Sequence, residues 1–473
     1  MEIKKLITFY ITMMFLVFSQ IACNNNAENE TNEQSTQIAK VNKPGEFVYK
    51  IDCRTDQTQS YAAYFPVSYK SQAPSPIIVV FDAHARGKMA VHKFQKTADE
   101  FGYIIVASNN AKNGLKSINS TINALFDDIF YRFNIDKKRV YTAGFSGGAR
   151  VASSVAIYKG GVAGVIAIAG GLPKVGQEVS HKFDFVAIVG VEDFNFLELR
   201  TLDKQMKELG FPHLLTITKN GHVWPDEKIL RTTVKWFEIQ SMKRGDIPVN
   251  DNLIRNYSQH MADSINVLVL NGKVYDAKKL YEQFLSTLDG LYDITEYQKS
   301  YEVLLKNPDI KNQENLIETL VKSEIEKQQQ YINMFKQQSF KQLLSEIHVQ
   351  KSEIQAKNVQ NRNRAKRLLN YMSMLSYIFS EGALKNNDLK MTVEYLRIYK
   401  KVEPDNPDRH FFEACVFANR NMEKEAIESL KKAVEFGFFD IVRIENERCL
   451  DKISKLSEFE SIIEEAKINI EAF

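Results

Sequence analysis

The sequence has almost no excess charge, few cysteines and only one long apolar run. Its 473 residues include 62 basic and 59 acidic side chains, which gives a formal net charge of +3. This balance provides no argument for nucleic-acid binding, and we expect no nucleic-acid partner. The four cysteines are scattered and form neither a disulfide framework nor a metal-ligand spacing. We predict that Cys415 and Cys449, which lie in apolar helical contexts, are core thiols.

The one long apolar run lies at the N-terminus. It spans Leu6–Ala22 and follows the basic pair Lys4 and Lys5. The run is short for a membrane span and suits a secretory signal. It ends at Cys23, after which the chain becomes polar, and this junction resembles the lipobox of bacterial lipoproteins. The resemblance implies a lipid on Cys23 that anchors the protein to a membrane of the bacterial cell envelope. An ordinary cleaved signal or a signal anchor is the alternative.

Composition divides the chain into four segments. Residues 1–22 are the predicted signal peptide, and residues 23–46 are a polar tether with too little apolar content to fold. Residues 47–240 alternate strand and helix patterns, whereas residues 250–473 carry long apolar periodicities near 3.6 with few glycines. We therefore expect an α/β domain followed by an all-α domain.

The α/β segment contains several continuous β-branched runs, as expected for strands buried on both faces of a largely parallel sheet. Alternation of these runs with helical patterns predicts a doubly wound, mostly parallel sheet. The predicted strands are Phe47–Ile51, Tyr61–Phe65, Ile77–Phe81, Tyr103–Ala107, Arg139–Ala143, Gly164–Ala169, Phe185–Gly190 and Leu214–Thr218.

A serine stands at the centre of this segment. The strand Arg139–Ala143 leads into Gly-Phe-Ser-Gly-Gly, with Ser146 at the apex and a small-residue helical segment behind it. Glycine on both sides fits a strained turn that lifts a hydroxyl clear of the backbone. The following helix would point free amides at whatever the hydroxyl attacks. This pattern makes Ser146 a candidate nucleophile.

Two later strands end in residues that complement a nucleophile. Glu192 and Asp193 follow one strand, and His222 follows the next. Ligands bind at the carboxyl ends of the strands in such sheets, so these side chains are expected near Ser146. The order serine, acid, histidine is that of the α/β-hydrolases.

Three motifs make the resemblance more specific. They are Gly221-His-Val-Trp-Pro225, Phe133-Asn-Ile-Asp136 and Arg139-Val-Tyr141. Together they resemble polyhydroxybutyrate depolymerase-like and feruloyl or acetyl-xylan esterase-like hydrolases, over roughly residues 47–240. The family's Gly-x-x-Asp spacing, counted from Gly190, favours Asp193 over Glu192 as the triad acid.

The chemistry assigns each residue a role. A serine hydroxyl is a weak nucleophile and needs an adjacent base, so His222 would take the proton of Ser146. Asp193 would orient the imidazole and stabilise its charged form. This mechanism requires no metal and no organic cofactor, and we expect none.

The oxyanion would be held by backbone amides. One belongs to Gly147, and the other comes from the loop after strand Ile77–Phe81, with Ala83, His84 and Ala85 as candidates. In the resembling esterases this loop has a histidine followed by glycines. His84 matches the histidine, but Ala85 replaces a glycine. Because of this difference, the shape of the pocket and the substrate do not follow from the resemblance.

The all-α segment carries a recurrence of 34 residues, clearest over 373–440. Thr392, Leu396, Tyr399 and Pro404 recur as Ala426, Leu430, Ala433 and Phe438. The pattern resembles tetratricopeptide repeats, which implies a face for a protein or peptide partner. A plain helical bundle is the alternative. We also predict one long exposed helix over Glu314–Val349, with Gln328–Gln330 on its solvated face.

Two functions from different classes follow. The first is a lipid-anchored serine hydrolase, foremost an esterase acting on acyl or aryl esters, such as those that decorate a polysaccharide; a serine peptidase is a variant with the same mechanism. The second is a non-catalytic envelope protein that uses a degraded hydrolase domain and helical repeats for binding or assembly. The complete order of Ser146, Asp193 and His222 favours catalysis.

Overall fold

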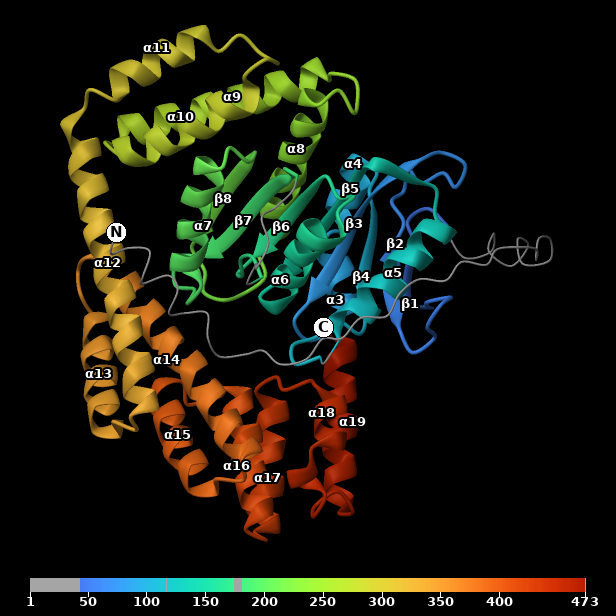
Figure 1. Ribbon diagram of the computed structural model, residues 1–473, viewed down its shortest axis with the longest axis vertical. Helices are drawn as coiled ribbons and strands as arrows, with labels where there is room; N and C mark the ends of the chain where they lie inside the picture. Colours follow the sequence, from blue (N-terminus) through green and yellow to red (C-terminus); the bar gives the residue numbers. More distant parts are fainter. Residues whose placement is uncertain (1–42, 116, 174–180, 473) are drawn as a thin grey trace, which may run out of the picture.

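A computed structural model describes residues 43–115, 117–173 and 181–472. Figure 1 shows a sheet flanked by helices and, after it in the chain, an arc of helices that passes around the sheet. The predicted signal peptide, Cys23 and most of the tether lie outside the described residues. The predicted fold class is confirmed, because a mostly parallel sheet between helices precedes a region of helices alone.

The sheet has eight strands in the order β1-β2-β4-β3-β5-β6-β7-β8. Strand β2 runs antiparallel to both of its neighbours, and every other pair is parallel. All eight predicted strands are present within a few residues of their expected bounds. They are β1 Phe47–Asp52, β2 Ser60–Tyr64, β3 Ser75–Asp82, β4 Ile104–Ser108, β5 Ile135–Phe145, β6 Gly164–Ile168, β7 Asp184–Gly190 and β8 His213–Thr218.

Helices cover both faces of the sheet, which explains its apolar strands. Every residue of β3, β4, β6 and β7 is buried, and the β-branched side chains alternate between two cores. One core packs beneath α5, α6 and α7, and the other beneath α3, α4 and α8. These helices are α3 Gly87–Lys93, α4 Gln95–Phe101, α5 Ile118–Arg132, α6 Gly147–Ser154, α7 Phe196–Glu208 and α8 Glu227–Lys243; a π-helical turn, Val155–Lys159, extends α6.

The helical region follows α8 and forms the arc in Figure 1. Successive helices pack as pairs, most extensively α14 with α15 and α16 with α17. The helices are α9 Asp251–Leu270, α10 Val274–Leu288, α11 Thr295–Leu304, α12 Pro308–Lys336, α13 Phe340–Glu353, α14 Val359–Lys385, α15 Leu389–Val402, α16 Pro407–Asn419, α17 Glu423–Glu435, α18 Ile441–Asn446 and α19 Ser457–Ala472, with a 3-10 turn η3 at Arg448–Leu450.

The 34-residue recurrence falls on two of these helices. Its first three positions lie on α15 and their counterparts on α17, and all six side chains are buried. The pairing of helices around them fits the predicted repeat pattern, while the repeat family itself stays a prediction. Within the described ranges, we find no helix with the length and apolar character needed to cross a bilayer.

The predicted long helix over Glu314–Val349 is wrong. Helix α12 ends at Lys336 and α13 begins at Phe340. Between them Gln338 takes a positive φ of 56°, and the Ser339 amide donates to the Met334 carbonyl, as in a helix-terminating turn. The chain can then reverse and pack α13 against α12. This packing also buries Gln328, which was expected on a solvated face.

The prediction that Cys415 and Cys449 are core thiols is also wrong. The two residues form a disulfide that joins α16 to η3, with their Cα atoms 5.1 Å apart. Their separation of 34 residues gave no sign of this pairing, because the contact depends on how the chain folds back after α17. Cys53 is a buried free thiol.

Candidate active site

Ser146 occupies a strained turn between β5 and α6. Its φ and ψ are 55° and −116°, a conformation that non-glycine residues rarely adopt. Neighbouring backbone leaves no room for side chains on either side of it. A Cβ on Gly144 would lie 2.1 Å from the Gly148 carbonyl oxygen, and one on Gly148 would lie 2.1 Å from the Phe81 carbonyl oxygen. Glycine is therefore needed at both positions to bring strand, turn and helix together.

His222 contacts both of its predicted partners. Its Nε2 lies 3.0 Å from Ser146 Oγ, and its Nδ1 lies 3.0 Å from Asp193 Oδ2. Asp193 is fully buried, and its other carboxylate oxygen accepts a 2.7 Å hydrogen bond from the backbone amide of Asn195. With Nδ1–H donating to the carboxylate, Nε2 is left to accept from the serine hydroxyl. The structure thus brings the three predicted side chains into one hydrogen-bonded chain.

Glu192, the alternative acid, points elsewhere. Its carboxylate pairs with Lys366 of α14 at 2.6 Å. In the turn after β7, Glu192 therefore faces α14, whereas the Asp193 side chain reaches His222.

Aromatic rings fix the plane of the imidazole. Phe194 stacks on His222 with ring centroids 4.3 Å apart, and Phe145 contacts the ring at 4.9 Å. Trp224 in turn stacks on Phe145 and donates from Nε1 to Asp82 Oδ2 at 3.1 Å. These contacts link the histidine loop to the loop after β3. The sequence showed that Phe194 and Trp224 follow strands, but it gave no sign of these partners.

Asp82 organises the loop that carries the candidate oxyanion donors. Its carboxylate accepts from the His84 amide at 2.9 Å and from Arg86 Nε at 2.8 Å. Burial raises the pKa of Asp82, but the hydrogen bonds and charge of Arg86, together with the His84 amide, lower it below its ordinary value. The carboxylate is therefore ionised at neutral pH and holds the loop in place. Sequence reasoning missed this residue.

The candidate amides differ in what they already bind. The His84 amide donates to the Asp82 side chain, and the Ala85 amide donates to the Asp82 carbonyl at 3.1 Å. These bonds favour Ala83 as the second donor beside Gly147, which is the first residue of α6. Ala85 has a positive φ of 59°, so it keeps the left-handed conformation that glycine adopts more readily.

Asn113 is a second residue that sequence reasoning missed, and it borders this site. Its Oδ1 lies 1.8 Å from the position that a Cβ on Gly147 would occupy. Its backbone amide donates to the Ala83 carbonyl at 2.9 Å. The exposed Asn113 side chain therefore covers Gly147 at the rim of the site. In the described part of the chain, no cluster of His, Cys, Asp and Glu side chains is arranged to bind a metal.

The sheet order, the antiparallel second strand and the serine turn define an α/β-hydrolase fold. No model of a protein family and no curated protein matches the chain. Similar solved structures include S-formylglutathione hydrolase from Staphylococcus aureus, with 12% identity over 41% of this chain and 96% of that chain and a TM-score of 0.33. A ferulic acid esterase has 14% identity over 41% of this chain and 97% of that chain, with a TM-score of 0.33.

Among peptidases, an acylaminoacyl peptidase has 16% identity over 44% of this chain and 43% of that chain, with a TM-score of 0.32. The similar structures thus include both esterases and a peptidase.

Proposed function

We propose that this chain is a serine hydrolase that cleaves carboxylic esters. The observation that carries the proposal is the continuous chain of contacts from Ser146 through His222 to the buried Asp193, with both distances at 3.0 Å. A serine in a merely structural turn needs neither an imidazole acceptor nor a buried acid behind it. Such an arrangement costs stability, because it buries a carboxylate and strains a backbone, and features of this kind cluster at functional sites.

The reaction proceeds in two halves. Ser146 Oγ attacks the ester carbonyl carbon while His222 Nε2 takes the hydroxyl proton. The bond to the leaving alcohol breaks, and His222 returns the proton to the alcohol oxygen, which leaves an acyl group on Ser146. Water then attacks this acyl group by the same route and releases the acid. Asp193 keeps the imidazole oriented, and the amides of Gly147 and Ala83 receive the oxyanion.

The altered loop after β3 is compatible with this chemistry. Ala85 takes the positive φ of a glycine, and ionised Asp82 holds the loop from within. An oxyanion site uses backbone amides, so a side chain that leaves the loop conformation in place leaves its donors in place. This favours a working hydrolase over a degraded domain that serves only for binding.

Labelling with a fluorophosphonate probe, together with hydrolysis of short-chain nitrophenyl esters, tests the proposal. Wild type is expected to be labelled and active, and Ser146→Ala is expected to be neither. Ser154→Ala is the matched control, because this hydroxyl lies on α6 and bonds the Arg150 carbonyl instead of His222. If wild type is no faster than Ser146→Ala and is not labelled, the non-catalytic binding function replaces the hydrolase.

We further propose that the protein is a lipid-anchored protein of the bacterial cell envelope. The apolar run before Cys23 supports export, and the disulfide between Cys415 and Cys449 supports an oxidising compartment. Metabolic labelling with a lipid analogue is expected to mark wild type but not Cys23→Ser. Equal labelling of the two would remove the lipid anchor from the proposal.

A further inference from the structure

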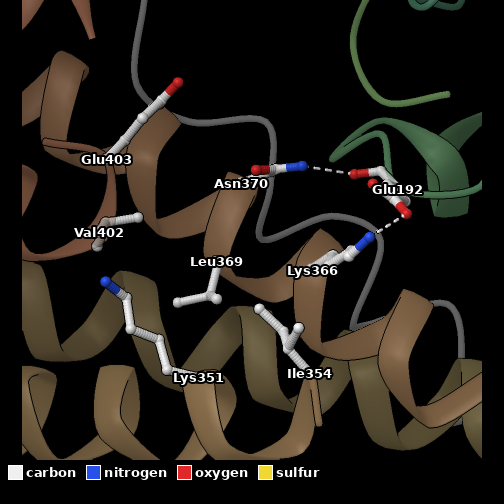
Figure 2. A pocket seen from close by; sticks show the side chains of 8 residues that line it. All are labelled: Glu192, Lys351, Ile354, Lys366, Leu369, Asn370, Val402 and Glu403. Carbon is white, nitrogen blue, oxygen red and sulfur yellow. Dashed lines mark hydrogen bonds and ion pairs between the residues drawn. The ribbon is translucent and has the colours of Figure 1, made fainter. Parts of the chain in front are cut away.

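One helix of the helical region contacts the active site. Helix α14 packs against the loop Val191–Asn195, which we call the acid loop because it carries Asp193. Figure 2 shows Lys366 and Asn370 extending from this helix to Glu192. Helix α14 makes three hydrogen bonds or ion pairs with this loop, and their partners are at least 174 residues apart in the chain.

The contacts end immediately before the acid. Arg367 Nη1 donates to the Val191 carbonyl at 2.8 Å, and Asn370 Nδ2 donates to the Glu192 carbonyl at 2.7 Å. Lys366 Nζ completes the set at 2.6 Å from the Glu192 carboxylate. Two consecutive carbonyl groups and a carboxylate are therefore bound from one helix, which fixes the backbone that leads into Asp193.

The opposite edge of the acid loop faces the histidine loop. The Val191 amide donates to the Thr218 carbonyl at 2.9 Å, and the Glu192 amide donates to the Asn220 carbonyl at 3.2 Å. The loop thus donates to the segment that carries His222 and accepts from α14. Neither edge depends on the Asp193 side chain, which is left to bind the imidazole.

Helix α14 is itself rigidly held. Arg367 forms a two-point ion pair with Glu324 of α12, at 2.8 and 2.6 Å, and both side chains are buried. Its guanidinium also lies 4.4 Å from the centre of the Phe196 ring, at the start of α7. A support of this kind can hold a catalytic group to a fraction of an ångström, which loop residues alone rarely achieve.

We propose that α14 is a positioning element of the hydrolase site, with Lys366 and Asn370 as positioning residues for Asp193. The inference rests on the proposed function, because it assigns Asp193 a catalytic partner in His222. It gives the helical region a part in catalysis: the α/β region supplies the reacting groups, and α14 holds the acid at the correct distance.

The surroundings allow the contacts to be removed without disrupting the fold. Lys366, Asn370 and Glu192 line a cavity of about 280 Å³, which Figure 2 shows between the acid loop and helices α13 to α15. Both side chains of the ion pair are partly exposed, at 38% for Lys366 and 25% for Glu192. Water can therefore solvate the groups that a substitution leaves without partners. Arg367 does not suit this purpose, since its removal would leave Glu324 buried and unpaired.

The test compares wild type with the double variant Lys366→Met/Asn370→Ala. Hydrogen exchange over the acid loop is expected to quicken, because its backbone amides are protected by local bonds. The Asp193 amide donates to the Gly190 carbonyl, and the Asn195 backbone amide donates to the Asp193 carboxylate. We expect kcat for a nitrophenyl ester to fall about 10-fold to 100-fold with KM nearly unchanged, since a small displacement of a catalytic group costs about that much. The single variant Lys366→Arg keeps both the positive charge and Asn370, and it is expected to retain most of the wild-type kcat.

Lys327→Met is the matched control. Lys327 forms a 3.0 Å ion pair with Glu346 of α13, with exposures of 28% and 20%, and this pair joins α12 to α13 and not to the acid loop. It should change neither exchange over the loop nor kcat. Unchanged exchange in the double variant overturns the proposal, and so does faster exchange with kcat equal to that of the control. If wild type is no more active than Ser146→Ala, the proposed hydrolase function is refuted instead. Hydrogen exchange then still shows, independently of activity, whether α14 holds the acid loop.

Discussion

The α/β region and the helical region bring distant residues together in different ways. In the α/β region the chain returns repeatedly to one sheet, so Ser146 and His222 meet across 76 residues because their strands end at the same edge. In the helical region most packing joins helices that are neighbours in the chain, such as α16 with α17. The sheet therefore assembles the chemistry, and the helical region adds a few long-range contacts around it.

This difference shows in what each region would lose through a local change. The turn at Ser146 and the strand ends depend on close backbone approach, so a single Cβ is enough to disturb them. The helical region depends on apolar cores and on separate side-chain links, including the pair between Lys366 and Glu192 and the disulfide between Cys415 and Cys449. We expect changes in the first region to affect catalysis most. Changes in the second should affect mainly stability, except at the α14 contacts with the acid loop.

The largest effect is expected from Asp193→Asn. An amide cannot fix the required tautomer of His222 or stabilise its charged form, and loss of the acid in such a triad lowers kcat about 10⁴-fold. Glu192→Gln removes only the ion pair with Lys366, so we expect a loss of at most about tenfold. Steady-state kinetics on a nitrophenyl ester measure both. Equal losses in the two variants would contradict the assignment of Asp193.

The strands, and the placement of Ser146, Asp193 and His222 at their ends, were predictable because local patterns encode them. Continuous β-branched runs mark strands buried on both faces, and Ser146, Asp193 and His222 each follow such a run. The choice of the triad acid was harder to predict, since Glu192 and Asp193 are adjacent in the sequence. Motif spacing favoured Asp193, and the structure brings that residue to His222.

What escaped prediction depends on how separate elements dock. Asn113 reaches Gly147, and Lys366 reaches Glu192, only after distant parts of the chain have packed. The reversal at Gln338 depends on a positive φ at a residue that has no turn preference. No periodicity or spacing records these events, because they follow from side-chain volumes and hydrogen-bond partners supplied by other segments.

The second prediction concerns the disulfide of the helical region. Replacing both partners, as Cys415→Ala/Cys449→Ala, frees the unfolded chain of a loop between residues 34 apart. We expect the free energy of unfolding to fall by about 2–4 kcal/mol, as is typical of disulfides that close such loops. Ester hydrolysis should persist, because the disulfide joins α16 to η3, whereas the triad residues contact one another within the α/β region.

Urea denaturation with and without a reducing agent measures this effect. Reduction should lower the stability of wild type and leave that of the double variant unchanged. A variant as stable as oxidised wild type would show that the disulfide contributes nothing to the helical region.

The third prediction concerns backbone approach at the end of β7. A Cβ on Gly190 would lie 2.0 Å from the Asn220 carbonyl oxygen and 2.4 Å from that of Gly221. These are backbone atoms of the histidine loop, so Gly190→Ala must push the acid loop and the histidine loop apart. We expect a loss of about 1–3 kcal/mol in unfolding free energy, as for other overpacked sites, together with reduced kcat.

Gly221→Ala is the control for that change. No atom lies within 4 Å of the Cβ position at Gly221, and its backbone is not left-handed. Its stability should stay within about 0.5 kcal/mol of wild type, as for most surface substitutions. Thermal unfolding of the two variants measures the difference, and similar losses in both would refute the steric explanation.

The smallest effect is expected at the junction of the two regions and depends on pH. Glu282 of α10 lies 3.0 Å from Lys278, 3.6 Å from Lys279 and 3.5 Å from Lys207 of α7. Burial raises the pKa of Glu282, but the hydrogen bond from Lys278 and the charges of the three lysines lower it from 4.5 to about 2. The stabilisation is complete above pH 4.5 and is lost as the pH falls toward 2.

Glu282→Gln should therefore destabilise the protein at pH 7 by about 1–2 kcal/mol, less than the full shift implies because Lys207 and Lys279 face solvent. The difference from wild type should shrink as the pH approaches 3, where the wild-type unfolded chain is already protonated at this position. Urea denaturation at several pH values measures it, with the exposed Glu318→Gln as the control. A difference that stays constant with pH would show that Glu282 stabilises the junction by packing alone and not by its charge.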